Sequence, residues 1–374
     1  MEIDCAFPGG NIVVDAVEGD RADVHQDLRD TAGDWFYWCF RLRGAAGHSV
    51  TVRFTGSDVI GVRGPAVSLD GGWTWRWLGA EAVAGKSFRY AVPADADDVR
   101  FSFGMPYQEA HLRRFLASHR GHPRLETGVL CATDKGRAAE WIRLGRLDGA
   151  CAHRVLLTAR HHCCEMMASY ALEGLMETVL TEPGVGAWLR EQVEFLVIPF
   201  VDKDGVEEGD QGKNRKPRDH CRDYLGDSIH ATTRAIRDFV PRWSGDRLRL
   251  AVDLHCPWIR GDLNECIYFV GGTDQAVWSR VQQFTGILAR VQAGPLVYNP
   301  ADNLPFGQGW NVAANWTQGQ TCSGWVAGLP GTPMGSSVEI PYANVKGGEV
   351  NADSARAFGR DLAGAIRVFL EQGS

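Results

Sequence analysis

The sequence has no long hydrophobic run and no excess of positive charge. None of its apolar stretches approaches the roughly 20 residues that a membrane-spanning helix needs. Its 39 Lys and Arg residues stand against 46 Asp and Glu residues, a formal net charge of −7, whereas nucleic-acid binding without sequence preference needs a broad basic surface. We therefore expect neither a membrane nor a nucleic acid as a partner.

Cysteines in the patterns that form disulfide scaffolds or structural zinc sites are also missing. The 374 residues contain ten cysteines, with Cys163 and Cys164 adjacent and no Cys-x-x-Cys pair, which suits free thiols. The first residues, Met-Glu-Ile-Asp-Cys, lack the basic and apolar regions of a secretory signal. These absences predict a cytoplasmic protein.

Three common catalytic motifs are absent as well. The chain has no Gly-x-Ser-x-Gly elbow, no Gly-x-Gly-x-x-Gly loop and no His-Glu-x-x-His pair. The sequence therefore lacks the signatures of α/β-hydrolases, dinucleotide-binding units and zincin-type proteases.

The first part of the chain has the pattern of an all-β module. Its aromatic and β-branched segments include 36–42, 49–54 and 99–103, and turn residues such as Gly44, Gly47 and Pro93 separate them. Short strands of this kind must each bury one face. We expect an antiparallel β-sandwich domain over residues 1–117, followed by a polar linker over 118–124.

The rest of the chain, 125–374, alternates buried strands with helices. Continuous apolar runs predict strands at 153–159, 194–201 and 249–254. Helical spacing of apolar residues predicts helices at 165–180, 275–291 and 354–371. The alternation indicates an α/β domain whose sheet is covered by helices on both faces.

His161-His162-Cys163-Cys164-Glu165 follows the first of these strands, at the sheet edge where ligands bind in α/β proteins. His162 and Glu165 can converge on one cation if the turn between them is tight, and His161 with Glu165 is the competing pair. A histidine at a strand end and a glutamate in the first turn of a helix also occur together by chance, since the helix dipole favours the glutamate. The pair therefore needs support from elsewhere.

Two further residues give that support. His255, in Asp253-Leu254-His255, ends another buried strand and offers a third ligand, which leaves one position for water as in catalytic zinc sites. Glu339 lies in the apolar segment 336–342, where a buried carboxylate needs a partner or a task. We expect Glu339 to be a general base; the alternative is an outward-facing glutamate on an edge strand.

A basic segment interrupts this acidic protein. Between Lys213 and Arg222 the chain has five Lys or Arg residues and one Asp. Such a segment is either a solvated loop or an anion site that binds a carboxylate with guanidinium groups.

In order and context the chain resembles the zinc metallocarboxypeptidases, and among them the cytosolic carboxypeptidase subgroup most. The N-terminal module adds Trp35-Phe36-Tyr37 and Pro106-Tyr107, so that the resemblance covers nearly the whole chain. The other matching pieces are Ala159-Arg160-His161-His162-x-x-Glu165, Asp204-Gly205-Val206, Arg215, Arg218-Asp219-x-x-Arg222, Asp253-Leu254-His255 and Val338-Glu339.

The resemblance implies a mixed central sheet in the second domain, one zinc ion per chain and a role for each matching residue. It makes His162, Glu165 and His255 the zinc ligands and Glu339 the base. Arg215 would polarise the scissile carbonyl, and Arg222 would grip the terminal carboxylate of the substrate. The basic residues Lys213, Lys216 and Arg218 hint at acidic substrate tails.

The chain departs from the family pattern at two places near the substrate. Cys221 stands where the family usually has Asn, and a thiol is a poorer donor than an amide, so that carboxylate binding is weakened or altered. No Tyr is found between Asn299 and Glu339, where the family often has one in a closing loop. Trp310, Trp316 or Trp325 is expected to cover the substrate instead.

The sequence therefore predicts a zinc-dependent metallocarboxypeptidase that releases C-terminal residues, with acidic residues such as glutamate as one option, from peptides or protein tails. A water activated by zinc would attack the peptide bond with Glu339 as the base. The alternative is a zinc-dependent amidohydrolase or deacylase that acts on a small acylated amino acid, which Cys221 keeps open. An inactive binding protein is the third hypothesis.

Overall fold

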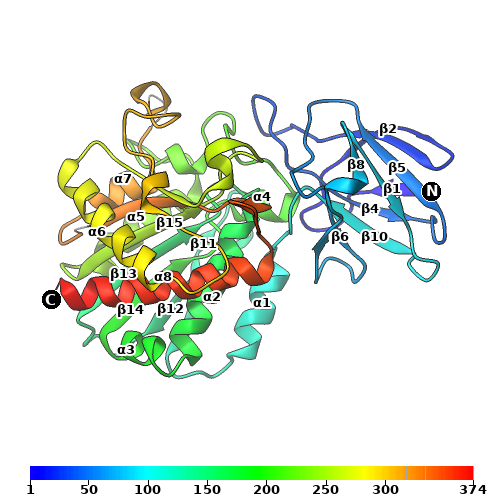
Figure 1. The fold of residues 1–374 in the computed structure, drawn as a ribbon. Helices are drawn as coiled ribbons and strands as arrows, with labels where there is room; N and C mark the ends of the chain where they lie inside the picture. Colours follow the sequence, from blue (N-terminus) through cyan, green and yellow to red (C-terminus); the bar gives the residue numbers. More distant parts are fainter. Residues whose placement is uncertain (317–318, 333, 374) are drawn as a thin grey trace.

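The computed structural model describes residues 1–316, 319–332 and 334–373, without the side chain of Trp316, and it has two halves (Figure 1). The N-terminal half contains two five-stranded sheets, and the C-terminal half contains one seven-stranded sheet between helices. In the part of the chain that is described, no helix is both long and apolar enough to cross a membrane.

The two N-terminal sheets are built from short strands. One has the order β1-β4-β10-β6-β7 and is antiparallel throughout; the other has the order β2-β3-β5-β9-β8. The strands are β1 (Glu2–Asp4), β2 (Val13–Glu18), β3 (Arg21–His25), β4 (Cys39–Arg43), β5 (Ser49–Phe54), β6 (Ala66–Ser68), β7 (Arg76–Trp77), β8 (Val83–Ala84), β9 (Ser87–Ala91) and β10 (Asp98–Ser102), with a 3₁₀ turn η1 (Ala80–Ala82).

Along these strands every second side chain points inward, and the inward-pointing side chains of the two sheets pack against each other. Val50 and Val52 of β5 are buried, and the ring of Phe88 in β9 lies 5.2 Å from that of Phe101 in β10. The prediction of an antiparallel module is wrong for one pair, since β3 and β5 are parallel. Between them the chain passes through β4 of the other sheet and so re-enters in the same direction.

The seven-stranded sheet of the C-terminal half is mixed, as the resemblance implies. Its order is β11-β12-β14-β13-β15-β17-β16, with β14, β13, β15 and β17 parallel and the outer strands antiparallel. The strands are β11 (Leu125–Ala132), β12 (Ala138–Gly145), β13 (His153–Ala159), β14 (Val193–Ile198), β15 (Leu248–His255), β16 (Tyr268–Val270) and β17 (Met334–Glu339), and a separate hairpin joins β18 (Asn344–Val345) to β19 (Gly348–Glu349).

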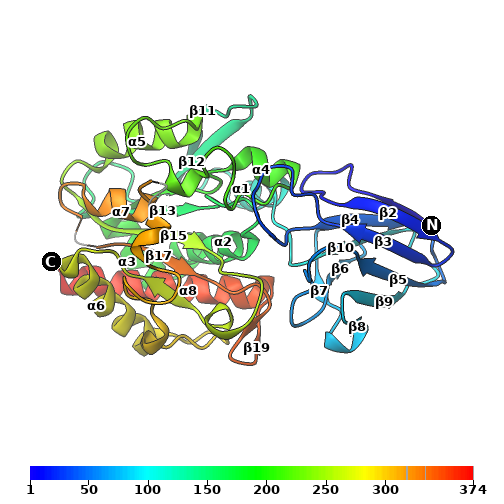
Figure 2. The same ribbon diagram turned by 90° about the horizontal axis from the view of Figure 1, so that it is seen from above.

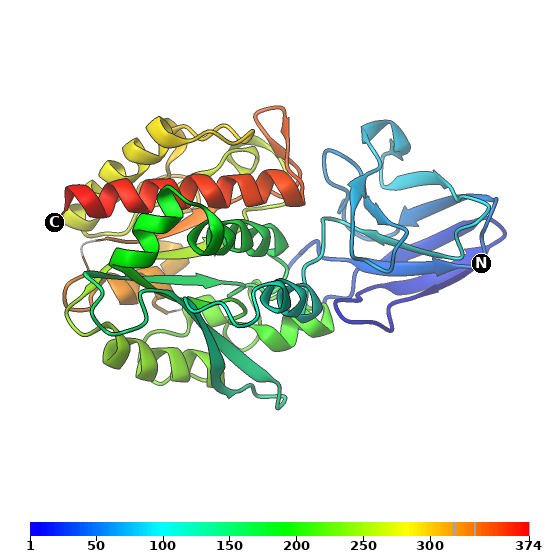
Figure 3. The same cartoon turned by 90° about the horizontal axis from the view of Figure 1, so that it is seen from below.

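Helices cover both faces of this sheet (Figure 2, Figure 3). On β13, Val155 and Leu157 belong to the core under α2 and α8, whereas Leu156 belongs to the core under α5 and α7. Because both faces of the sheet are buried, the strands have continuous apolar sequences and not alternating ones. The helices are α1 (Glu109–Ser118), α2 (Met166–Thr181), α3 (Val185–Gln192), α4 (Lys203–Glu208), α5 (Ala231–Ser244), α6 (Gln275–Val291), α7 (Cys322–Ala327) and α8 (Ala352–Gln372), with 3₁₀ turns η2 (His220–Arg222), η3 (Asp262–Glu265), η4 (Pro300–Asp302) and η5 (Ala313–Trp316).

Helix α1 lies at the end of the segment predicted to be all-β. It is followed by His119, which contacts Glu177 of α2 at 2.6 Å, and it is preceded by Tyr107, whose hydroxyl donates to Glu173 at 2.6 Å. The helix therefore packs beside α2 in the C-terminal half (Figure 1). The domain limits 1–117, 118–124 and 125–374 stay a prediction.

Candidate metal centre

The carboxyl ends of three neighbouring parallel strands meet at the candidate site. His162 and Glu165 follow β13, His255 is the last residue of β15, and Glu339 is the last residue of β17. After β13 the buried Arg160 adopts a φ of 63° and donates from Nε to the carbonyl of Cys163 at 2.9 Å. This bond closes the turn that brings the imidazole of His162 back to the carboxylate of Glu165.

Two imidazole nitrogens converge on the Glu165 carboxylate. His162 Nδ1 lies 2.9 Å from Oε1, and His255 Nδ1 lies 2.7 Å from Oε2. One ligand atom from each of the three residues lies within 4.8 Å of the other two. Burial raises the pKa of Glu165, but Lys213 and the two imidazoles outweigh it and hold this pKa well below its ordinary value. Two imidazoles and one carboxylate fit a divalent transition metal.

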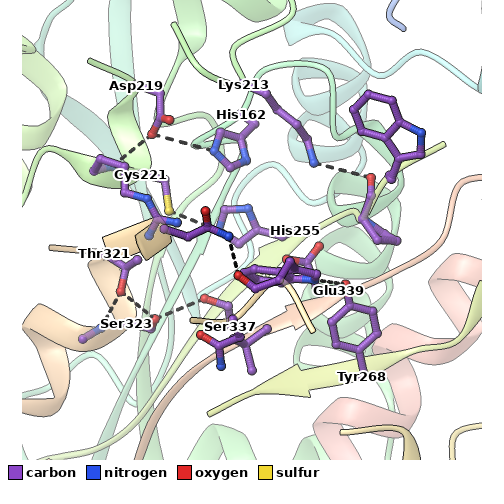
Figure 4. Close-up of a pocket in the computed structure, with 18 of the residues that line it drawn as sticks. His162, Lys213, Asp219, Cys221, His255, Tyr268, Thr321, Ser323, Ser337 and Glu339 are labelled. Carbon is purple, nitrogen blue, oxygen red and sulfur yellow. Dashed lines mark hydrogen bonds and ion pairs between the residues drawn. The ribbon is translucent and has the colours of Figure 1, made fainter. Parts of the chain in front are cut away.

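Each of these imidazoles has a second carboxylate on its other nitrogen. His255 Nε2 lies 2.7 Å from Asp253 Oδ2. Figure 4 shows the other contact, in which His162 Nε2 lies 3.8 Å from Asp219 Oδ1. Burial lowers the pKa of His162, but Glu165 and Asp219 outweigh it and raise this pKa to about 9. Such carboxylates fix the tautomer and the orientation of a ligating histidine.

The imidazole of His161 does not contact Glu165 and instead binds Asp253 and Tyr224. Its Nδ1 lies 2.8 Å from Asp253 Oδ1, and its Nε2 lies 2.8 Å from the hydroxyl of Tyr224. Both ring nitrogens are therefore used, and the competing pair of His161 with Glu165 does not form.

Glu339 faces the same cluster from the adjacent strand. It pairs in register with His255, and it is 8% exposed. Its Oε2 atom is buried and has no hydrogen-bond partner among the described residues. Burial raises the pKa of Glu339, and His255 lowers it by less, so that this pKa lies above its ordinary value. The alternative of an edge-strand glutamate is wrong, because β17 lies between β15 and β16.

A cavity of about 490 Å³ opens beside the cluster (Figure 4). Aromatic rings of Trp35, Trp258 and Trp310 line one part of it, and Trp35 comes from the N-terminal half. The hydroxyls of Thr321, Ser323 and Ser337 line another part and form a chain of contacts at 3.3 and 3.1 Å.

Only some of the basic residues between Lys213 and Arg222 belong to the described lining of this cavity. Lys213 and Arg222 line it, whereas Arg215 and Arg218 are not among the described residues that do. The Arg215 guanidinium lies 2.6 Å from Asp202 Oδ2 and 2.9 Å from Asp210 Oδ2.

The structure places Arg215 and Arg218 outside the described lining of the cavity, and their expected roles at the scissile carbonyl and at the substrate stay predictions. Two buried carboxylates hold Arg215 away from the cavity, and Arg218 lies 3.3 Å from Asp223 instead. Lys213, which the sequence suggested only as one of the basic residues that hint at acidic tails, has its Nζ 2.7 Å from Glu165 Oε1.

Asp253 was also not singled out, although the sequence contains a signal for it. Residues i and i+2 of a strand point to the same side, so that Asp253-x-His255 in an apolar strand places the carboxylate beside the imidazole. Tyr268 of β16 pairs in register with Glu339 and lines the cavity. Its hydroxyl accepts a hydrogen bond from Trp310 Nε1 at 3.2 Å.

The tryptophans expected to cover the substrate differ in position. Trp310 lines the cavity, whereas the ring of Trp325 lies 5.3 Å from that of Tyr224. The side chain of Trp316 lies outside the described part of the chain.

Of the clustered cysteines, Cys221 is the one that reaches the cavity. Its Sγ lies 3.9 Å from His255 Nε2 (Figure 4). Cys163 and Cys164 are buried packing residues, and burial raises the pKa of Cys164 to about 12. All ten cysteines are free thiols.

No family model matches the chain. Its sequence is similar to that of an uncharacterised bacterial protein and to those of cytosolic carboxypeptidases. It is 25% identical over 220 residues to an uncharacterised protein of Zymomonas mobilis, covering 55% of this chain and 54% of that protein. It is 28% identical over 153 residues to cytosolic carboxypeptidase 2 of Danio rerio, covering 38% of this chain and 21% of that protein. The matches thus span about half and about a fifth of these relatives.

Solved structures match over the whole chain. A metallo-carboxypeptidase from Burkholderia cenocepacia gives a TM-score of 0.81 at 19% identity, over 100% of this chain and 99% of that one. A metallo-carboxypeptidase from Pseudomonas aeruginosa, in complex with (2-guanidinoethylmercapto)succinic acid, gives 0.73 at 20% identity over 100% of both chains. The fold is that of these proteins, and the resemblance to zinc metallocarboxypeptidases near the cytosolic subgroup is confirmed.

Proposed function

We propose that this chain, a relative of the zinc metallocarboxypeptidases, removes the C-terminal residue of a peptide or a protein tail with one zinc ion. The observation that carries the proposal is the convergence of His162, Glu165 and His255 at a cavity that also contains Glu339 and Arg222. The donor set suits zinc, and Glu339, whose buried Oε2 has no hydrogen-bond partner among the described residues, lines the same cavity.

In this proposal zinc, when bound, polarises the scissile carbonyl and lowers the pKa of the attacking water. Glu339 takes the proton from that water and passes it to the leaving amine. Arg222 binds the terminal carboxylate through its guanidinium group, so that internal peptide bonds are poor substrates. Asp253 and Asp219 hold the imidazoles in orientation.

In this proposal the C-terminal side chain of the substrate is polar, because hydroxyl groups line part of the cavity. Its hydroxyl-lined part, formed by Thr321, Ser323 and Ser337, is neutral. Of the basic residues behind the option of acidic tails, Lys213 lines the cavity, whereas Lys216 is exposed and, like Arg218, does not belong to the described lining. The ten free thiols and the cytosolic relatives support a cytoplasmic location.

The experiment is zinc content by mass spectrometry, together with C-terminal release from a mixed peptide library. Wild type should contain about one zinc per chain and release single C-terminal residues. Glu339→Gln should keep the zinc and lose the activity, and His162→Ala should lose both. Wild-type protein that folds but neither binds zinc nor cleaves any peptide would contradict the proposal.

The second candidate is a deacylase that uses the same zinc chemistry on a small acylated amino acid. Cys221 keeps it open, since a thiol in place of the amide that the family usually has beside Arg222 alters the binding of the substrate carboxylate. Release of the acyl group from N-acyl amino acids, without peptide cleavage, would select this function. Zinc binding with neither reaction would leave the inactive binding protein.

A further inference from the structure

The N-terminal half holds the backbone around Lys213. Asp30 accepts hydrogen bonds from the backbone N–H groups of Gln211 and Gly212, at 3.0 and 2.9 Å. The hydroxyl of Thr31 donates to the carbonyl of Lys213 itself. These bonds fix the conformation of the chain immediately before and at Lys213.

Gly212 brings this segment against the loop that contains the candidate metal ligands. Its φ is +76°, and a Cβ at this position would lie 2.5 Å from the backbone nitrogen of Cys163. Only glycine allows so close an approach with this backbone conformation. The next side chain, that of Lys213, therefore enters the cavity beside Glu165.

The ammonium group of Lys213 has two firm partners. Nζ donates to the Cys256 carbonyl at 2.8 Å and lies 2.7 Å from Glu165 Oε1, while its contact with the Pro257 carbonyl is long, at 3.4 Å. The ring of Trp35 lies 5.4 Å from it. Because an ammonium has three donors, one of them can turn to a substrate oxygen.

Arg215 has no such freedom. Its two terminal nitrogens face Asp202 and Asp210, and only 15% of its side chain is exposed. Moving this guanidinium to the cavity would leave two buried carboxylates without their partner, which is strongly unfavourable. Within the basic segment, Lys213 is the cation next to the candidate metal ligands.

We infer that Lys213, and not Arg215, faces the oxygen of the scissile carbonyl in this chain. The inference rests on the proposed function. Negative charge grows on that oxygen as water adds to the carbonyl, and a fixed positive donor in a shielded cavity stabilises it. Lys213 acts as a hydrogen-bond donor to this oxygen, while Glu339 carries the proton. The N-terminal half thus takes part in the site by positioning this lysine.

The test compares Lys213→Met, Lys213→Arg and the exposed control Lys216→Met for kcat, KM, zinc per chain and thermal unfolding. Lys213→Met should keep about one zinc per chain and lose about 10²–10³-fold in kcat, with a much smaller change in KM. Lys213→Arg should recover part of the loss, and Lys216→Met should match wild type. A kcat of Lys213→Met within threefold of wild type would overturn the inference.

Zinc content separates this role from a purely structural one. If Lys213→Met loses zinc in proportion to its activity, the lysine serves only to hold Glu165, and the inference is overturned. If Lys213→Met does not fold but Lys213→Arg does, the kinetics of Lys213→Arg and its succinate affinity decide.

Succinate binding tests Lys213 without catalysis, by calorimetry on the zinc-loaded protein. In this proposal one carboxylate binds Arg222 and the other binds Lys213, which both line the cavity. If wild type cleaves no peptide, the proposed function fails, but a loss of at least tenfold in succinate affinity in the Lys213 variants, with zinc retained, still supports the position of this cation. Unchanged succinate affinity would overturn it.

Discussion

The carboxylate of Asp30 accepts a hydrogen bond from the backbone N–H of Gly212 at 2.9 Å, across the boundary between the two halves of the chain. The bond connects a loop that follows β3 to the segment that carries Lys213. The cavity therefore depends on a contact between residues 182 positions apart.

We predict that Asp30→Ala lowers kcat/KM by about tenfold or more, because two backbone N–H groups lose their acceptor. Asp30→Asn retains one amide oxygen and should have a smaller effect. Steady-state kinetics on the peptide library give the comparison, with the exposed Asp34→Ala as control. Equal kinetics for Asp30→Ala and wild type would show that the segment holds its conformation without the N-terminal half.

Asp253→Asn should weaken zinc binding by about 10–100-fold, the usual effect of losing a carboxylate behind a ligating histidine. Competition with a chelator measures this affinity. His161→Gln keeps a donor toward Asp253 and should therefore lower the zinc affinity less than His161→Leu does. Zinc affinity in Asp253→Asn equal to that of wild type would contradict the role of this carboxylate.

Replacing Cys221 by Asn should lower the KM for peptides about tenfold, with kcat within about threefold of wild type. An amide adds a good donor beside Arg222, and a hydrogen bond to a charged group contributes about 1.5–3 kcal/mol. Peptide kinetics provide the measurement, and Cys221→Ala, which adds no donor, should give no improvement. An equal gain in both variants would mean that space, and not the amide, limits binding.

The buried Glu194 of β14 should make stability depend on pH. It accepts from Arg143 Nε at 2.7 Å and from Trp243 Nε1 at 2.8 Å. Burial raises its pKa, but these donors outweigh it, so that this pKa lies below the ordinary value of 4.5. Its stabilisation is therefore complete above about pH 4.5 and is lost as the pH falls through the folded-state pKa.

Urea unfolding between pH 7 and pH 3 tests this pH dependence with Glu194→Gln. The variant should be less stable than wild type by about 3–5 kcal/mol at pH 7, and the difference should shrink in acid. The exposed Glu191→Gln is the control. A constant difference across this pH range would contradict the assignment.

Local patterns in the sequence predicted much of the C-terminal half. Strand β13 and helix α6 have the predicted bounds, because apolar runs and helical spacing are set by neighbouring residues. The parallel pairing of β3 with β5 and the contact of His119, which follows α1, with Glu177 of α2 could not be predicted in this way. Both depend on the path of the chain between distant segments.

By itself, the sequence determined which residues stand at the strand ends. His162, Glu165, His255 and Glu339 meet because the carboxyl ends of parallel strands lie at one edge of a sheet. Only the tertiary structure decided which cation enters the cavity. Lys213 and Arg215 are two positions apart on an irregular segment, and their directions are set by Asp30, Asp202 and Asp210, whose carboxylates reach them through folding.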